Sequence, residues 1–236
     1  MRTSDPLHDA TDGGANARAW SVAWRCGALA IVAFLAGCNT TSHTALDTVR
    51  LIASGGRDIT PDPAEVAASP YARIQTEGGG IRAVMVLGND DSGLESWYGD
   101  RRHIVFLREG LLAGTFGLSH DVEDIRIEGD NPFAHLAMVG EQPVAVSRRY
   151  DWRASYRYGV PVTGQLSRRG SEVVEILGTT RTLVRYEEVL RGPGVDARNE
   201  YWAEPDTGFI WKSRQFVAPG AMLEIVQLKP YRRERP

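Results

Sequence analysis

Residues 199–217, with the sequence NEYWAEPDTGFIWKSRQFV, hold two strand-forming runs around one turn. The runs at 199–203 and 209–217 are rich in aromatic and β-branched residues, which favour strands. Between them, residues 204–208 carry proline early and glycine late, as in the type I and type II turns that join antiparallel neighbours. This stretch therefore predicts a pair of antiparallel strands.

The same pattern recurs on both sides of this pair. Further strand-forming runs occupy residues 71–76, 81–87, 94–98, 102–107, 111–115, 156–166, 172–177, 179–190 and 222–228, with a weaker one at 122–127. Turn residues separate the runs, and no helix-length pattern alternates with them, which argues against a parallel arrangement. Residues 133–146 fit a helix or a loop. We expect a mainly β domain, built as one large curved antiparallel sheet that forms a half-barrel or a sandwich.

Two short helices are expected before the first strand. Leu46, Val49 and Ile52 lie three apart along one face, and a glycine pair follows them. Asp62 then suits an N-cap, with Pro63 at the first helical position. The sheet is therefore expected to follow short N-terminal helices.

Composition narrows the functional classes. The chain has 236 residues and a formal net charge of −3, so its charge balance indicates no nucleic-acid partner. Its two cysteines, Cys26 and Cys38, both lie near the start. The rest of the chain therefore has no disulfide framework, cysteine metal site or catalytic thiol.

An apolar leader precedes the expected domain. Residues 26–36, CGALAIVAFLA, are apolar, follow Arg25 and are too few to span a bilayer. A run of this length after a positive charge indicates the apolar part of a secretory signal peptide. The competing interpretation is a buried core helix. The tetrapeptide at 35–38, LAGC, resembles the lipobox of bacterial lipoproteins. In such proteins the cysteine, here Cys38, takes up diacylglycerol and becomes the mature N-terminus, and two acyl chains suffice for stable anchoring.

These signals divide the chain into three parts. We expect a leader and lipoprotein signal peptide at 1–37, the lipidated cysteine and a tether at 38–43, and a single periplasmic β domain at 44–236. Asn39 is not the aspartate that retains such lipoproteins in the inner membrane. The expected location is therefore the outer membrane, lipid-anchored, at its periplasmic face.

Several motifs together resemble the group 4 capsule polysaccharide lipoprotein family, of the YjbF/GfcB type. They are the lipobox, SPYARI at 69–74, residues 81–87, Trp97, IVFLREGLLAGTFGL at 104–118, YDW at 150–152, residues 199–215 and EIVQLKP at 224–230. The resemblance spans nearly the whole mature chain. It implies an outer-membrane lipoprotein that assists polysaccharide export or assembly, with no catalytic residues to carry over.

One stretch interleaves cations with aromatic rings and is the candidate glycan-binding site. It comprises Arg148, Arg149, Tyr150, Trp152, Arg153, Tyr156, Arg157 and Tyr158. Guanidinium groups hold carboxylate or phosphate, and flat rings can stack on sugar faces. The alternative, which we favour, is a strand pair whose aromatic rings face the core and whose arginines face water.

Three other groups of residues are weaker candidates for a functional site. Asp121, Glu123 and Asp124 offer the carboxylates that a glycoside hydrolase needs, but adjacent loop residues are usually solvated. The three histidines of the expected domain, at 103, 120 and 135, show no metal-binding spacing, so no metal or cofactor is expected. Arginines at 232, 233 and 235 form a basic tail that could contact anionic lipid or polysaccharide.

Three aromatic residues of the last strands, Trp202, Trp211 and Phe216, are expected to form one cluster, because a tight turn joins their strands.

The sequence thus favours a non-enzymatic accessory lipoprotein of exopolysaccharide or capsule export. Its expected partners are outer-membrane lipid, through the acyl anchor, and polysaccharide or other export-machinery proteins. Two alternatives stay open: a periplasmic carrier of a lipid-like or glycan ligand, and a glycan-cleaving enzyme.

Overall fold

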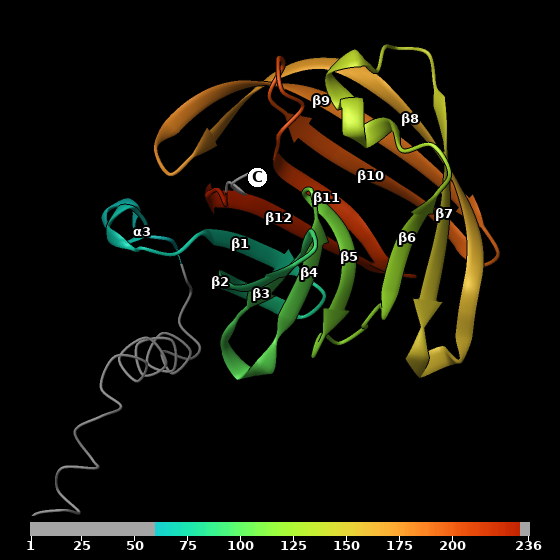
Figure 1. Cartoon of the computed structure of the whole chain (residues 1–236), viewed down its shortest axis with the longest axis horizontal. Coiled ribbons are helices and arrows are strands. Elements are labelled where there is room, and N and C mark those ends of the chain that lie inside the picture. Colours follow the sequence, from blue (N-terminus) through green and yellow to red (C-terminus); the bar gives the residue numbers. More distant parts are fainter. Residues whose placement is uncertain (1–59, 232–236) are drawn as a thin grey trace, which may run out of the picture. The chain divides into compact units, whose positions relative to one another are not determined.

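The structure is a computed structural model that describes residues 60–231, and it contains one antiparallel sheet of twelve strands (Figure 1). The strands are β1 (Arg73–Gly78), β2 (Ile81–Asp91), β3 (Leu94–Tyr98), β4 (Ile104–Arg108), β5 (Leu111–Phe116), β6 (Asp124–Glu128), β7 (Val144–Trp152), β8 (Arg157–Ile176), β9 (Thr179–Gly192), β10 (Val195–Ala203), β11 (Ile210–Ala218) and β12 (Ala221–Lys229). The predicted mainly β class, with one large curved antiparallel sheet, is confirmed.

The sheet order explains how the curvature arises. Nearly every strand pairs with its neighbours in the chain, and β1 also pairs with β12, which leaves β5 and β6 as the two edges. These edges approach each other where β6 begins, since the N–H of Thr115 on β5 donates at 2.8 Å to the carbonyl of Val122, which lies just before β6. The sheet is therefore a nearly closed barrel rather than a sandwich, and it opens only along the line between β5 and β6.

One of the two predicted short helices lies in the described residues and is confirmed. In α3 (Pro63–Ala68) the Asp62 carboxylate accepts the N–H of Ala64 at 2.8 Å, as an N-cap does. Ser69, which precedes a proline, adopts extended geometry and ends the helix. The first expected helix, the leader with Cys38 and the basic tail lie outside the described residues.

Apolar side chains form three clusters. The largest includes Met85, Trp97 and Tyr150 and draws on most of the strands. A second gathers Phe133, Leu136 and neighbouring strand residues. The third joins α3 to β12 and to the far part of the β8–β9 hairpin. Together they hold the curved sheet and its hairpin in one unit.

Two strand assignments differ from the sequence prediction. Residues 156–166 and 172–177 belong to one strand, β8, because the polar run between them pairs with β9 through a bulge between Arg168 and Gly170. Residues 144–152 form β7, hydrogen-bonded to β6 and β8, whereas the prediction left residues 133–146 as a helix or a loop and favoured a strand pair only from residue 148 onward. In both places ladder hydrogen bonds outweigh a weak apolar pattern. The segment before β7 contains a short 3-10 helix, Pro132–Met138.

The expected single aromatic cluster is wrong. Trp202 and Trp211 belong to the third apolar cluster, whereas Phe216 packs in the first, with ring centroids 5.8 Å from Tyr150 and 6.2 Å from Trp152. Positions 211 and 216 are an odd number of residues apart, so a strand sends their side chains to opposite faces. A shared turn does not bring such residues together.

Candidate functional site at the seam of the sheet

The line along which β5 meets β6, here called the seam, buries a sheet edge. Residues 111–115 of β5 are all buried, and because successive strand residues alternate between faces, both faces of this strand are covered. From β11, Gln215 accepts the N–H of Leu112 at 2.9 Å and donates to the carbonyl of Gly110 at 3.0 Å. Unpaired N–H and C=O groups at a sheet edge can bind a strand of another chain. Here the Gln215 side chain satisfies two such backbone groups.

Asp121 organises the loop that crosses the seam. Its carboxylate accepts hydrogen bonds from the hydroxyl of Thr115 at 2.9 Å and from the N–H groups of Gly117 at 2.8 Å and Leu118 at 3.0 Å. Thr115 in turn accepts the N–H of Val122 at 3.0 Å. Asp121 therefore closes the loop and has no carboxylate oxygen without a partner.

Beside the seam lies a cavity of about 350 Å³, here called the seam cavity. β4 and β5 form one wall, with Phe106 and Arg108, and β6 forms the other, with Arg126. The rest of the polar lining consists of Asn131, the buried Arg148 and the carboxylates of Glu109, Glu123 and Asp124. The volume is typical of small-ligand sites, which span about 300–1,000 Å³.

Arg148 belongs to a buried polar cluster. Its Nε and Nη2 donate to the two carboxylate oxygens of Glu188 at 2.7 and 2.9 Å. Glu188 Oε2 also accepts from the Tyr201 hydroxyl at 2.9 Å and from Asn199 Nδ2 at 3.1 Å. Arg148 is 3% exposed and Glu188 is 0% exposed, so this ion pair is shielded from water.

Electrostatics in the cluster follow from this burial. Desolvation would lower the pKa of Arg148, but the adjacent Glu188 carboxylate raises it above its usual value. Burial, assisted by the negative charge of Glu188, raises the pKa of Tyr201 well above its usual value. Arg148 is therefore a permanent cation and Tyr201 a permanent hydrogen-bond donor.

A glycine makes room for the cluster. A Cβ atom at Gly164 on β8 would lie 2.2 Å from Oε1 of Glu188. Glu188 lies on β9 directly opposite Asn199 on β10, which places the acid and the amide side by side. Because a buried ion pair loses the hydration of both charges, it is tolerated only with good geometry and additional hydrogen bonds, which these neighbours supply.

The structure divides the predicted glycan-binding residues into two groups. Arg148, Tyr150 and Trp152 alternate along β7 and are all buried. The rings of Tyr150 and Trp152 stack with centroids 5.1 Å apart, and the indole N–H of Trp152 donates to the carbonyl of Val217 at 2.8 Å. The aromatic residues of β7 are thus core residues, as the favoured interpretation expected, but Arg148 faces inward with them.

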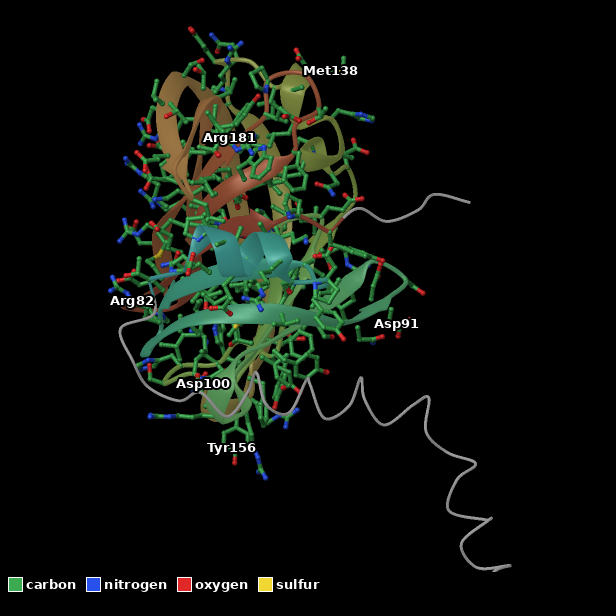
Figure 2. The ribbon with its side chains drawn as sticks, turned by 90° about the vertical axis from the view of Figure 1, so that its left-hand side faces the viewer. Arg82, Asp91, Asp100, Met138, Tyr156 and Arg181 are labelled. Atoms are coloured by element: carbon green, nitrogen blue, oxygen red, sulfur yellow. The ribbon has the colours of Figure 1, made fainter. Side chains whose placement is uncertain are left out.

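The second group lies on the opposite face of β7 and around the β7–β8 turn. Tyr156 is 87% exposed and Tyr158 is 56% exposed. Arg149 pairs with Glu128 at 2.9 Å, Arg153 pairs with Glu123, and Arg157 lies over the Trp152 ring at 5.1 Å. Figure 2 shows Tyr156 at one end of the domain and Met138 at the other. The predicted set therefore does not form one site.

Two of the carboxylates that could serve a glycoside hydrolase, Glu123 and Asp124, form ion pairs with arginines. Glu123 binds Arg153, whose hydrogen bond lowers the pKa of this carboxyl group, and Asp124 binds Arg126. A general acid needs a raised pKa, which Glu123 does not have. Within residues 60–231, no group of three or more His, Cys, Asp and Glu side chains is arranged to hold a metal ion.

Sequence reasoning missed Gly164, Glu188, Asn199 and Tyr201 as a group. The one available signal is on β9, where positions 184, 186 and 190 are buried apolar or aromatic residues and Glu188 occupies the same face. A carboxylate on a buried face requires a buried partner.

Comparisons with known proteins agree with this fold. Residues 46–228 match the model of a family described as group 4 capsule polysaccharide lipoprotein gfcB, YjbF. The uncharacterized lipoprotein GfcB of Escherichia coli K12 is 24% identical over 202 residues, which cover 84% of this chain and 94% of GfcB.

A solved crystal structure shares the fold of this chain. The crystal structure of the hypothetical lipoprotein YmcC from Escherichia coli K12 is 20% identical and aligns with a TM-score of 0.61 over 74% of this chain and 92% of that one. An exported protein of Bacteroides fragilis with a YmcC-like fold is 11% identical and aligns with a TM-score of 0.33, over 69% of this chain and 95% of that one. Of the helices in the described part of this chain, none is long and apolar enough to cross a bilayer.

Proposed function

Because the chain belongs to the group 4 capsule polysaccharide lipoprotein family, we propose that it is a non-enzymatic accessory factor in exopolysaccharide or capsule export or assembly. The lipid on Cys38 anchors it to the periplasmic face of the outer membrane. There the β domain binds polysaccharide or a protein of the export machinery.

The seam cavity is the observation that carries this proposal. It is a lined, open site on a sheet whose other strand edges are paired, so the domain offers a fixed surface for binding. Of the carboxylates in or beside it, Glu123 and Asp124 are held by arginines and Asp121 by backbone N–H groups, which suits binding better than acid–base chemistry. The lipobox supplies the anchor.

Gene deletion tests the role in polysaccharide production. We expect the deletion strain to lose surface polysaccharide, measured as extractable acidic or total sugar per cell, and the wild-type gene to restore it. Unchanged surface polysaccharide in the deletion strain would contradict the proposal.

The anchor is tested with the two cysteines. We expect Cys38→Ser to abolish palmitate labelling and to move the protein out of the outer-membrane fraction. Cys26→Ser is the matched control, because it alters a cysteine of the same leader that is outside the lipobox, and it should leave labelling and fractionation intact. Normal labelling of the Cys38→Ser protein would overturn the anchor.

A further inference from the structure

We propose that the seam cavity binds an acidic sugar, a hexuronate unit, through its carboxylate. The inference rests on the proposed function, since it takes the polysaccharide as the ligand. It adds the chemical class of the sugar and the place where it binds.

Arg148 supplies the buried end of this site. A guanidinium has five N–H donors, and here Nε and Nη2 use theirs on Glu188 and on the hydroxyl of Tyr201. Among the described residues, none accepts a hydrogen bond from the two N–H groups of Nη1, and Arg148 lines the cavity. The remaining donors therefore belong to a fixed, desolvated cation. Such donors form charge-assisted hydrogen bonds with a carboxylate, which are about twice as strong as neutral ones.

The two walls add further donors. Arg108 on β4 donates only to the carbonyl of Ser92, at 3.4 Å, and no carboxylate in the described part of the chain forms an ion pair with it. Arg126 on β6 uses Nη1 on Asp124 and Asp151, which leaves its other guanidinium nitrogens for a ligand. Arginines from both walls and from the interior therefore line the same cavity.

The lining of the seam cavity has little net charge. Glu123 and Asp124 are neutralised by Arg153 and Arg126, and Glu109, in the β4–β5 turn, is the remaining carboxylate of the lining. Positive and negative charges are therefore nearly balanced. Recognition of an acid here depends on directed hydrogen bonds rather than on a strong positive field.

Apolar residues of the cavity suit the ring of a sugar. Phe106 and Leu94 lie on one wall and Ile125 on the other. A pyranose ring presents C–H groups on its faces and polar groups at its edges, and sites with a few placed polar groups among apolar ones fix the orientation of such ligands. A hexuronate matches both parts of this lining.

Ligand-observed NMR titration of the mature lipidated protein in detergent tests the inference. The probes are methyl β-D-glucuronide, methyl β-D-glucoside and inorganic phosphate. We expect saturable binding of the glucuronide, at least about ten-fold weaker binding of the glucoside, and glucuronide binding weakened about ten-fold by Arg108→Gln, because a hydrogen bond to a charged group contributes about 1.5–3 kcal/mol. Arg101→Gln is the matched control, since Arg101 is exposed and precedes β4 at its opposite end.

Each outcome decides the inference. Equal binding of glucuronide and glucoside, or an unchanged affinity in Arg108→Gln, overturns it. Binding of phosphate as tight as that of the glucuronide assigns the cavity to anions in general and overturns the sugar assignment. Loss of surface polysaccharide on gene deletion together with no glucuronide binding rejects this site while the proposed function stands.

Discussion

Two sets of ion pairs on the same sheet differ in their exposure to water. Inside the sheet, Arg148 and Glu188 are almost fully buried and share their hydrogen bonds with Asn199 and Tyr201. Elsewhere on the sheet, Arg185 pairs with Glu200 at 2.6 Å, and neighbouring pairs continue from β8 to β12. The distances are similar, but the surroundings differ. Geometry alone therefore does not tell how much a pair contributes, because water screens one set and is excluded from the other.

The largest effect is expected from breaking the buried pair. Glu188→Gln removes the charge that compensates Arg148, so we expect the free energy of unfolding to fall by about 3–5 kcal/mol. Urea denaturation followed by circular dichroism measures this loss. A loss below about 1 kcal/mol would show that water reaches the pair.

The matched variant removes both charges. In Arg148→Met with Glu188→Leu, no buried charge is left without a partner, so most of the lost stability should return, to within about 2 kcal/mol of wild type. This folded double variant should also lose glucuronide binding, because Nη1 is gone. Retained binding would place the carboxylate elsewhere.

The second effect tests whether the buried pair is rigid. Gly164→Ala places a Cβ atom against a carboxylate that Arg148 holds in place, so we expect a loss of about 1–3 kcal/mol from overpacking. Gly140→Ala is the control, because nothing lies within 4 Å of a Cβ atom there, and it should change stability by less than about 0.5 kcal/mol. Equal effects of the two substitutions would mean that Glu188 moves freely.

Asp151 is intermediate between the two sets and gives a pH test. Burial alone would raise the pKa of this carboxyl group, but the N–H of Gly159 and the guanidinium of Arg126 lower it below its ordinary value of 3.8. A lowered pKa in the folded state means that the ionised form adds stability at neutral pH. That stability is lost as the pH falls below about 4, through the pKa of the folded state.

We therefore expect Asp151→Asn to lower the free energy of unfolding at pH 7 by about 1 kcal/mol and to flatten its decline below pH 4. Unfolding curves at several pH values measure both effects. An unchanged acid limb in the variant would assign that limb to other carboxylates.

The smallest effect is expected from the partly exposed pairs. Glu200→Gln removes the partner of Arg185, so the loss of unfolding free energy should stay below about 1 kcal/mol and shrink further in 1 M salt. The comparison with Glu188→Gln uses the same chemical change in two environments. A loss as large as that of Glu188→Gln would remove the distinction between the two sets.

The fold was largely predictable because turns and strand-forming runs are set by residues close together in the sequence. The turn at 204–208 forms as expected, with the N–H of Gly208 donating to the carbonyl of Glu204 at 2.9 Å, and the runs around it become β10 and β11. β7 was predicted only as part of a strand pair within residues 148–158, because its arginines mask the alternation of its buried residues. Its pairing with β6 and β8 is decided by distant segments rather than by its own sequence.

The site was less predictable because it depends on the register of the strands. Arg148 stood out in the sequence for its aromatic neighbours, but its actual partner is Glu188, 40 residues away on β9. Whether the two meet depends on how β7, β8 and β9 align, and a shift of one residue would turn either side chain to the other face. The sequence shows the residue types, and only the sheet shows which of them share an interior.

The pairing of β1 with β12 has a consequence for the order of folding. The earliest strand of the sheet finds its second neighbour only in the latest one, with Arg73 opposite Lys229, so the hairpins can form as the polypeptide is made, but the β1–β12 pair must wait until almost the whole domain is available. Until then the edge of β1 that later pairs with β12 has no partner. The domain therefore acquires its full stability only at the last step of its synthesis.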